Sequence, residues 1–355
     1  MHYMVNTGDT LWHIAQRFRI DVDALARANS ITEPYSVYPG QILRIPRRHR
    51  LIGYIVPHAS SAGIADVLSS PEPFDEVIYT AVTVEPDGSA TAGPVDIALQ
   101  LARARRTRAV VGVTNLCRGT YSVEAADNAL LDDNARSRLA SVAADCTISN
   151  HLDGVHLDFG AITAQHFDAL ADLACEIRAR FTKLSPWYTL SIAAPSGWRE
   201  GPYNLAHAAQ CADTVMVEGF QRGASGTPGP PTDLAWLEQQ ATYALEDVGP
   251  SRLCVLLGAY GLDWDESGAG FLTVEAAAAI AANTGARIER DPAHGGPFFQ
   301  YTDTTGKLHS VWYEDSASIL LKLATLDSMG VRKVALWRLG AVPRDILAVL
   351  SQSVV

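Results

Sequence analysis

Short apolar segments alternate with helix-like segments from residue 51 almost to the end of the chain, and this alternation limits the possible folds more than any other feature. Each apolar segment has the length of a buried strand, and the segments between them repeat apolar residues at helical spacing. The expected strands are 51–56, 76–82, 109–114, 155–159, 189–194, 214–220, 253–257 and 333–337. The expected helices include 95–104, 133–145, 165–181, 236–246, 274–284 and 315–329.

Eight buried strands alternating with helices over about 300 residues favour an α/β fold, a (β/α)8 TIM barrel. A doubly wound open sheet is the alternative that the same pattern allows. In a barrel, functional side chains are expected at the carboxyl ends of the strands.

The first 46 residues have a different pattern, in the order strand, helix, helix, strand. Asp9 or Thr10 is expected to cap the first helix, whose apolar face begins with Leu11. The second helix is expected to end near Asn29, and a Tyr-Pro-Gly turn precedes the last strand. The expected divisions are a small βααβ domain over 1–46, a linker over 47–50 and the barrel over 51–355.

Composition excludes several classes of protein. The chain has 48% hydrophobic and 19% charged residues, as ordinary globular proteins do. Its net charge of −11 argues against nucleic acid as a partner, because phosphate binding needs a basic face. No apolar run approaches the roughly 20 residues that span a bilayer, and the N-terminus lacks the pattern of a signal peptide. We therefore expect no membrane partner and no export signal.

The five cysteines are scattered, odd in number and mostly in apolar surroundings. No CxxC pair is present to suggest a metal site. We expect all five to be buried reduced thiols, which favours a reducing compartment. The sequence also predicts no cofactor.

Three stretches of the small domain, YMVNTGDTLWHIAQRF, LARANSI and YPGQILRIP, resemble the LysM module at nearly every marker position. LysM modules bind polymers that contain N-acetylglucosamine, such as peptidoglycan or chitin, in a shallow groove between two strand–helix loops. The resemblance implies a groove formed by Gly8, Asp9, Thr10, Leu11, Asn29, Ser30 and Ile31. Alternatively, Asp9 and Thr10 are only helix caps and Leu11 is only a core residue.

Four strand ends of the larger domain, DGVHLDFG, VMVEGFQ, GAYGLDW and VALWRLG, resemble family 18 glycoside hydrolases, as does SVWYEDSASI. The resemblance is to the LysM-bearing branch that acts on bacterial spore cortex. It implies cleavage after N-acetylglucosamine, in which the acetamido oxygen of the substrate attacks the anomeric carbon. It also implies a location in the spore or cell-wall envelope, although a cytoplasmic protein fits the sequence as well.

The chain departs from the family pattern where the family carries its general acid. The family strand reads D-G-x-D-x-D-x-E. Here Asp158 stays where the family has the Asp that orients the acetamide, His156 replaces the outer Asp, and Gly160 replaces the proton donor. Where the family has M-x-Y-D on the sixth strand, this chain has Glu218, Gly219, Phe220 and Gln221. Hydrolysis by the family's route is therefore not expected, because a general acid typically contributes about 10²–10⁴ in rate.

A relocated acid is the alternative to lost catalysis. Glu218 is expected to face the same way as Phe220, and a raised pKa would let it act as an acid. In the simpler interpretation, Glu218 pairs with His156. A metal site formed by His156, Asp158 and Glu218 is suggested only by residue type.

Several aromatic and acidic residues at strand ends are expected to contact sugar. Trp337 stands where the family has a tryptophan that forms the floor of a sugar subsite, and Asp315 either belongs to the site or caps the last helix. The expected substrate-binding residues are His156, Phe220, Gln221, Tyr260, Asp263 and Trp337. The candidate catalytic residues are Asp158 and Glu218. Three functions stay open: a non-catalytic glycan-binding protein, an active glycosidase with Glu218 as its acid, and a protein-binding scaffold.

Overall fold

The computed structural model describes residues 2–18, 20–45, 49–56, 60–71, 74–95, 107–185, 187–194, 198–199, 201, 203–220, 226–340 and 342–350. Most of the expected helix at 95–104, half of the expected linker and Gln221 fall outside these residues. Among the helices described, none is long and apolar enough to cross a membrane.

The N-terminal residues form a small βααβ domain with its own core. Its elements are β1 (His2–Met4), α1 (Leu11–Arg17), α2 (Val22–Ala28) and β2 (Ile42–Arg44). The two strands are antiparallel, with Tyr3 opposite Leu43. Thr10 caps α1 by accepting from the His13 amide, whereas Asp9 accepts hydrogen bonds from the amide of Asn6 and the hydroxyl of Tyr3. The two helices and two strands thus enclose one small core.

The larger domain is a closed (β/α)8 barrel. Eight parallel strands close it within the described residues, because β3 pairs with both β4 and β18. An open doubly wound sheet is therefore excluded. The strands are β3 (Arg50–Ile55), β4 (Glu76–Val84), β6 (Arg108–Thr114), β9 (Gly154–Asp158), β10 (Thr189–Ala193), β11 (Thr214–Glu218), β12 (Leu253–Gly258) and β18 (Lys333–Trp337). All eight lie where the sequence predicted strands.

Side chains alternate between the inside and the outside of the barrel along each strand. One apolar cluster fills the space between strands and helices, and a second, which contains Tyr54, Met216 and Leu256, lies inside the barrel. The described helices around the strands are α3 (Ser60–Ser69), α5 (Val123–Leu130), α6 (Asp133–Ser149), α7 (Ala164–Thr182), α8 (Leu205–Cys211), α9 (Leu234–Val248), α11 (Ser316–Ser328) and α12 (Arg344–Leu350). Short strands β5 (Ala90–Ala92), β7 (Leu116–Cys117) and β8 (Thr120–Tyr121) lie in the loops after β4 and β6.

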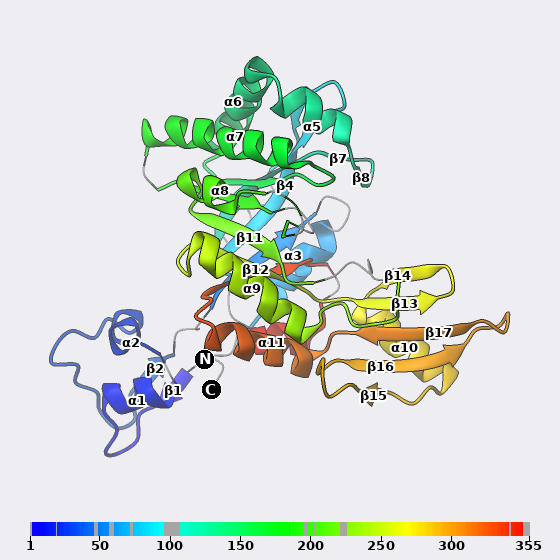
Figure 1. Ribbon diagram of the computed structural model, residues 1–355. Coiled ribbons are helices and arrows are strands. Elements are labelled where there is room, and N and C mark those ends of the chain that lie inside the picture. The colour runs from blue at the N-terminus through cyan, green and yellow to red at the C-terminus, as the bar shows by residue number, and fades with distance from the viewer. Residues whose placement is uncertain are drawn as a thin grey trace.

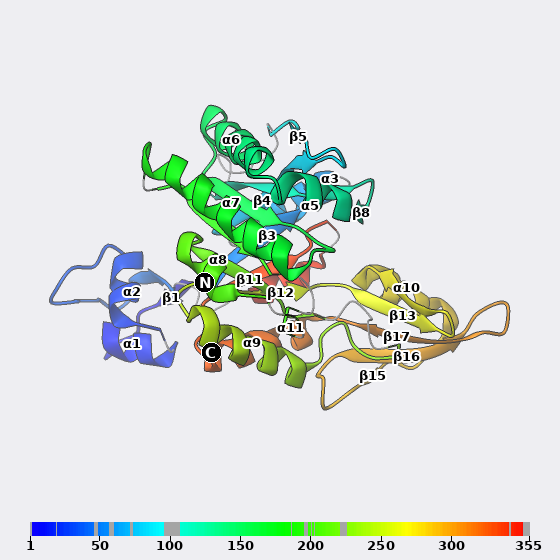
Figure 2. The ribbon, with the colours of Figure 1, turned by 45° about the horizontal axis from the view of Figure 1, so that its top comes forward.

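A second sheet is inserted between the seventh and eighth barrel strands, and the sequence did not predict it. Its five strands are antiparallel, in the order β14-β13-β17-β16-β15. They are β13 (Gly261–Asp265), β14 (Gly268–Leu272), β15 (Glu289–Arg290), β16 (Pro297–Thr302) and β17 (Leu308–Tyr313), with helix α10 (Val274–Thr284) among them. This insertion extends away from the barrel, on the side opposite the small domain (Figures 1 and 2).

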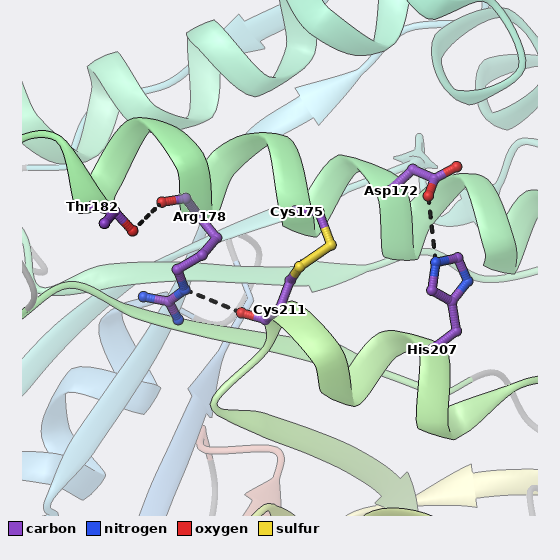
Figure 3. The surroundings of a disulfide bond; sticks show 6 residues. All are labelled: Asp172, Cys175, Arg178, Thr182, His207 and Cys211. Atoms are coloured by element: carbon purple, nitrogen blue, oxygen red, sulfur yellow. Dashed lines mark hydrogen bonds and ion pairs between the residues drawn. A yellow bond between two sulfur atoms is a disulfide. The ribbon is translucent and has the colours of Figure 1, made fainter.

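Two of the five cysteines form a disulfide, so the prediction of five reduced thiols was wrong for this pair. Cys175 on α7 is bonded to Cys211 at the end of α8 (Figure 3). They are 36 residues apart in the sequence, and only the packing of α7 against α8 brings their Cα atoms to 5.0 Å. Arg178 reinforces the same junction by donating to the carbonyl oxygen of Cys211. The remaining cysteines, Cys117, Cys146 and Cys254, are free thiols.

Candidate functional site

A pocket of about 240 Å³ opens at the carboxyl ends of the barrel strands. Asp158, Glu218 and Trp337 are the last residues of β9, β11 and β18, and all three line it. The structure therefore brings together three of the four strand ends that the sequence singled out. The pocket is also lined by Tyr54, Tyr121, His156 and Gly160.

Asp158 is held by two tyrosine hydroxyls. Tyr54, from β3, donates to Oδ2 at 2.7 Å, and Tyr121, from β8, lies 3.4 Å from both carboxylate oxygens. Burial, together with the neighbouring charge of Asp158, raises the pKa of Tyr54 well above its usual range. Tyr54 therefore keeps its proton, and Asp158 faces the pocket as an oriented hydrogen-bond acceptor.

His156 is fully buried below Asp158, with its ring edge against Tyr54. Its Nδ1 shares a 2.8 Å hydrogen bond with Oγ of Ser191 on β10. Nε2 has no hydrogen-bond partner among the described residues, so the expected pair between His156 and Glu218 is not formed. Burial lowers the pKa of His156 to about 3, which leaves the ring neutral at physiological pH. Because the buried ring is neutral, it offers the Glu218 carboxylate no charge to pair with.

Gly160 is packed against the ring of Tyr121. A Cβ atom built on Gly160 would lie 2.4 Å from Cδ2 of that ring, a distance that real Cβ atoms essentially never show. Asn115 fixes the backbone of Gly160 from both sides: its Oδ1 accepts from the Gly160 amide at 3.0 Å, and its Nδ2 donates to the Gly160 carbonyl at 2.9 Å. The space that a side chain at position 160 would need is therefore occupied by an aromatic ring.

Glu218 is half-buried and faces the same pocket as Asp158. In the described part of the chain, no three His, Cys, Asp or Glu side chains are placed together to hold a metal ion. The metal site suggested by the residue types of His156, Asp158 and Glu218 is therefore not formed.

The remaining expected sugar-binding residues divide into a pocket residue and supporting residues. Trp337 is half-buried and lines the pocket. Phe220 and Tyr260 are buried behind it, with ring centroids 5.8 and 6.2 Å from that of Trp337. Asp263 lies on β13 of the insertion, where it accepts from the hydroxyl of Tyr301 and pairs with His309. The structure thus places Asp263 outside the pocket.

Asp315 caps α11, which settles the choice left open by the sequence in favour of a helix cap. Its Oδ1 accepts from the Ser318 amide at 2.8 Å, and the Ser318 hydroxyl accepts from the Asp315 amide. Arg290 of the insertion forms an ion pair with the same carboxylate. Asp315 thus joins α11 to the insertion.

In the small domain, the residues expected to bind glycan have structural partners. Asn29 joins α2 to β2, because its side chain bonds both the amide and the carbonyl group of Arg44. Leu11 is 1% exposed and belongs to the core. Gly8 and Ser30 have positive φ angles of 93° and 55°, and so shape the two loops. Asn29 and Leu11 are thus tied into the fold, whereas Thr10 and Ser30 are exposed at the two loops.

Three site residues were missed by the sequence analysis. Tyr54 lies on an expected strand, and its alternation with Ile52 and Val56 would have placed it inside the barrel. Tyr121 and Asn115 lie in the loop region after β6, where no periodic pattern indicates direction. Only the folded chain brings them to Gly160.

Comparison with known proteins follows the division into two domains. Residues 3–46 match the LysM domain, and residues 50–341, most of the chain, match glycosyl hydrolases family 18. The putative sporulation-specific glycosylase YdhD of Bacillus subtilis is 24% identical over 95% of this chain and 84% of its own length. The cortical fragment-lytic enzyme of Bacillus subtilis is 26% identical over 72% of this chain, which spans 62% of that enzyme.

Solved structures show the same architecture. The spore cortex-lytic enzyme SleL of Bacillus cereus superposes with a TM-score of 0.75 at 21% identity, covering 98% of this chain and 85% of SleL. At this identity the likeness concerns the fold. The family match covers residues 50–341, which is most of the chain. This chain therefore belongs to glycosyl hydrolases family 18 and carries an N-terminal LysM domain.

Proposed function

We propose that this protein binds glycans containing N-acetylglucosamine, of the peptidoglycan or chitin type, without hydrolysing them. The observation that carries the proposal is position 160, which has no acidic side chain and is filled by the ring of Tyr121. A glycosidic oxygen needs a proton as its bond breaks, and neither glycine nor a neutral phenol is a good donor at neutral pH.

Features that support sugar binding remain in the pocket. Trp337 offers an aromatic face, and Asp158 offers acceptor oxygens that two tyrosines orient. Aromatic faces and oriented polar groups are the parts from which small-molecule sites are usually built. The LysM domain supplies a second glycan-binding element on the same chain.

The names of the relatives support peptidoglycan as the glycan. They are a sporulation-specific glycosylase, a cortical fragment-lytic enzyme and a spore cortex-lytic enzyme. We infer by this similarity a location in a spore or cell-wall layer. The relatives' activity is not carried over, because this chain lacks the acid at position 160.

A second candidate function is slow hydrolysis with Glu218 as the acid and Asp158 as its partner. The observation that favours it is that both carboxylates line one pocket. This function predicts turnover that disappears in Glu218→Gln.

Mass spectrometry distinguishes the two. N-acetylglucosamine oligomers and cortex muropeptides would be incubated for a long time with concentrated protein. Intact oligomers, together with binding that weakens in Trp337→Ala, support the proposal. Shorter products that are absent with Glu218→Gln overturn it in favour of hydrolysis. If the protein binds none of these glycans, both the binding function and the hydrolytic function are overturned.

A further inference from the structure

Tyr121 takes up the space that a side chain at position 160 would need. Its ring atoms Cδ2, Cγ and Cε2 lie 2.4–2.6 Å from the place of a Cβ at Gly160. We propose that Tyr121 is a ligand-contacting and positioning residue of this pocket, whose ring replaces a side chain at 160 and whose hydroxyl helps to orient Asp158. This inference rests on the proposed glycan-binding function and deepens it.

Hydrogen bonds from Asn115 hold the backbone on both sides of the contact between Tyr121 and Gly160. Asn115 is fully buried and bonds the backbone of Gly160 through both its amide nitrogen and its oxygen. The same Nδ2 donates to the carbonyl of Ser122, and the Ser122 amide donates to the carbonyl of Asn115 at 2.9 Å. One side chain therefore ties the residue after Tyr121 to Gly160. The backbone that carries the Tyr121 ring is thereby fixed beside Gly160.

The hydroxyl of Tyr121 complements that of Tyr54. Tyr54 donates to one oxygen of Asp158 at 2.7 Å, and the Tyr121 hydroxyl lies 3.4 Å from each of the two oxygens. Two carboxylate oxygens offer about four acceptor positions. Asp158 therefore presents to the pocket a carboxylate that can accept from an N–H or O–H group of a sugar, with its plane fixed by the tyrosines.

Tyr121 also reaches the ligand space. It is half-buried and lines the pocket together with Asp158 and Gly160. A phenol offers a sugar both an apolar ring and a hydroxyl group that donates and accepts. The ligand class that fits this wall is an uncharged N-acetylated oligosaccharide, whose hydroxyl and amide N–H groups can donate to a carboxylate and whose ring faces can contact a phenol ring.

The test uses the full chain, titrated calorimetrically with the N-acetylglucosamine pentamer. Because the LysM domain also contributes binding, the share that is lost in Trp337→Ala defines the binding by the pocket. Tyr121→Phe keeps the ring and removes the hydroxyl, so we expect pocket affinity to fall about fivefold with an unchanged melting temperature. The matched control is Tyr301→Phe, which removes a hydroxyl bonded to the Asp263 carboxylate in the insertion, outside the pocket, and leaves affinity unchanged.

A second readout concerns charge selectivity, which a purely structural role would not alter. Without the Tyr121 hydroxyl, Asp158 is a less satisfied anion and attracts an ammonium group more strongly. We expect Tyr121→Phe to shift the affinity ratio toward the de-N-acetylated pentamer by roughly threefold or more. An unchanged ratio combined with unchanged affinity overturns the inference.

The steric part of the inference is tested by a double-mutant cycle. Gly160→Ala drives a methyl group into the Tyr121 ring and is expected to weaken pocket binding and lower the melting temperature. The double variant Gly160→Ala/Tyr121→Ala should behave like Tyr121→Ala alone, because the methyl group then has room. Gly229→Ala, whose Cβ would lie 3.9 Å from its nearest neighbour, is the matched control.

The experiments distinguish failure of this inference from failure of the proposed function. If the unaltered chain shows no share of binding that depends on Trp337, the proposed pocket function and the inference both fall. If that share exists but Tyr121→Phe and the cycle leave it unchanged, only the inference falls. Should Gly160→Ala fail to fold, Tyr121→Phe decides.

Discussion

Nζ of Lys322 lies 2.7 Å from Oε2 of Glu314, and both side chains are about 1% exposed. Ser318 donates a second hydrogen bond to the same carboxylate oxygen at 2.6 Å. Glu314 directly follows β17 of the insertion, whereas Lys322 and Ser318 belong to α11. This buried ion pair therefore fastens the end of the insertion to the barrel.

Lys322→Met is expected to lower the free energy of unfolding by about 3–5 kcal/mol, because it leaves the Glu314 carboxylate buried and unpaired. Urea denaturation followed by circular dichroism measures the loss. Glu314→Gln/Lys322→Met, which removes both charges, should recover much of it. Equal losses in the single and double variants would show that the charge is not the cause.

The stability of the folded chain should fall in acid partly because of His156. Its folded pKa is about 3, whereas an unfolded histidine has a pKa of about 6.5. Between these values the unfolded chain binds a proton that the folded chain does not. Stability from this group is therefore complete above about pH 6.5 and declines as the pH falls toward 3.

His156→Gln should make the decline shallower by about 1 kcal/mol per pH unit between pH 6 and pH 4. Denaturation at several pH values gives the slope. The exposed His151 provides the control, and His151→Gln should keep the slope of the unaltered chain. An unaltered slope in His156→Gln would mean that this histidine is not the group responsible.

The disulfide should stabilise the chain against unfolding without acting on the pocket. It joins residues 36 positions apart, for which loop-closure entropy predicts a loss of about 3–4 kcal/mol when both cysteines become serine. The Cys175→Ser/Cys211→Ser variant should therefore melt earlier and still bind glycan at 20 °C or so. Arg178 retains its bonds at this junction, which keeps the native packing. Lost binding in a variant that is folded at that temperature would contradict this separation.

Asn29→Ala should loosen the small domain at β2. It removes the bonds of Asn29 to Arg44 and to the Leu25 carbonyl, with an expected cost of roughly 1–3 kcal/mol. Hydrogen exchange followed by mass spectrometry should show faster exchange in Ile42–Arg44. Thr32→Ala alters an exposed side chain of the adjoining loop and should leave exchange unchanged. If Asn29→Ala weakens glycan binding without faster exchange, its role is contact with the ligand instead.

The barrel could be predicted because the sequence pattern of each strand and helix lies within that element. Each strand and helix carries its own periodicity, and the eight strands appeared where that pattern placed them. The insertion was missed because its strands are short and partly exposed, and its helix, Val274–Thr284, looked like one more barrel helix.

At the site, strand ends were predictable and their partners were not. Asp158 and Trp337 follow from their position at the ends of strands. Tyr121 comes from a loop hairpin, and its contact with Gly160 depends on how two distant loops pack. Cys175 and Cys211 posed the same problem, since two helices lying side by side decide their pairing.

The seventh and eighth barrel strands, β12 and β18, are hydrogen-bonded directly to each other, although the whole insertion lies between them in the chain. The ring of strands is thus complete without any residue of the second sheet. Closure of the barrel therefore places no requirement on the length of that segment. What holds the insertion to the barrel is side-chain packing and ion pairs, not the hydrogen bonds of the strand ring.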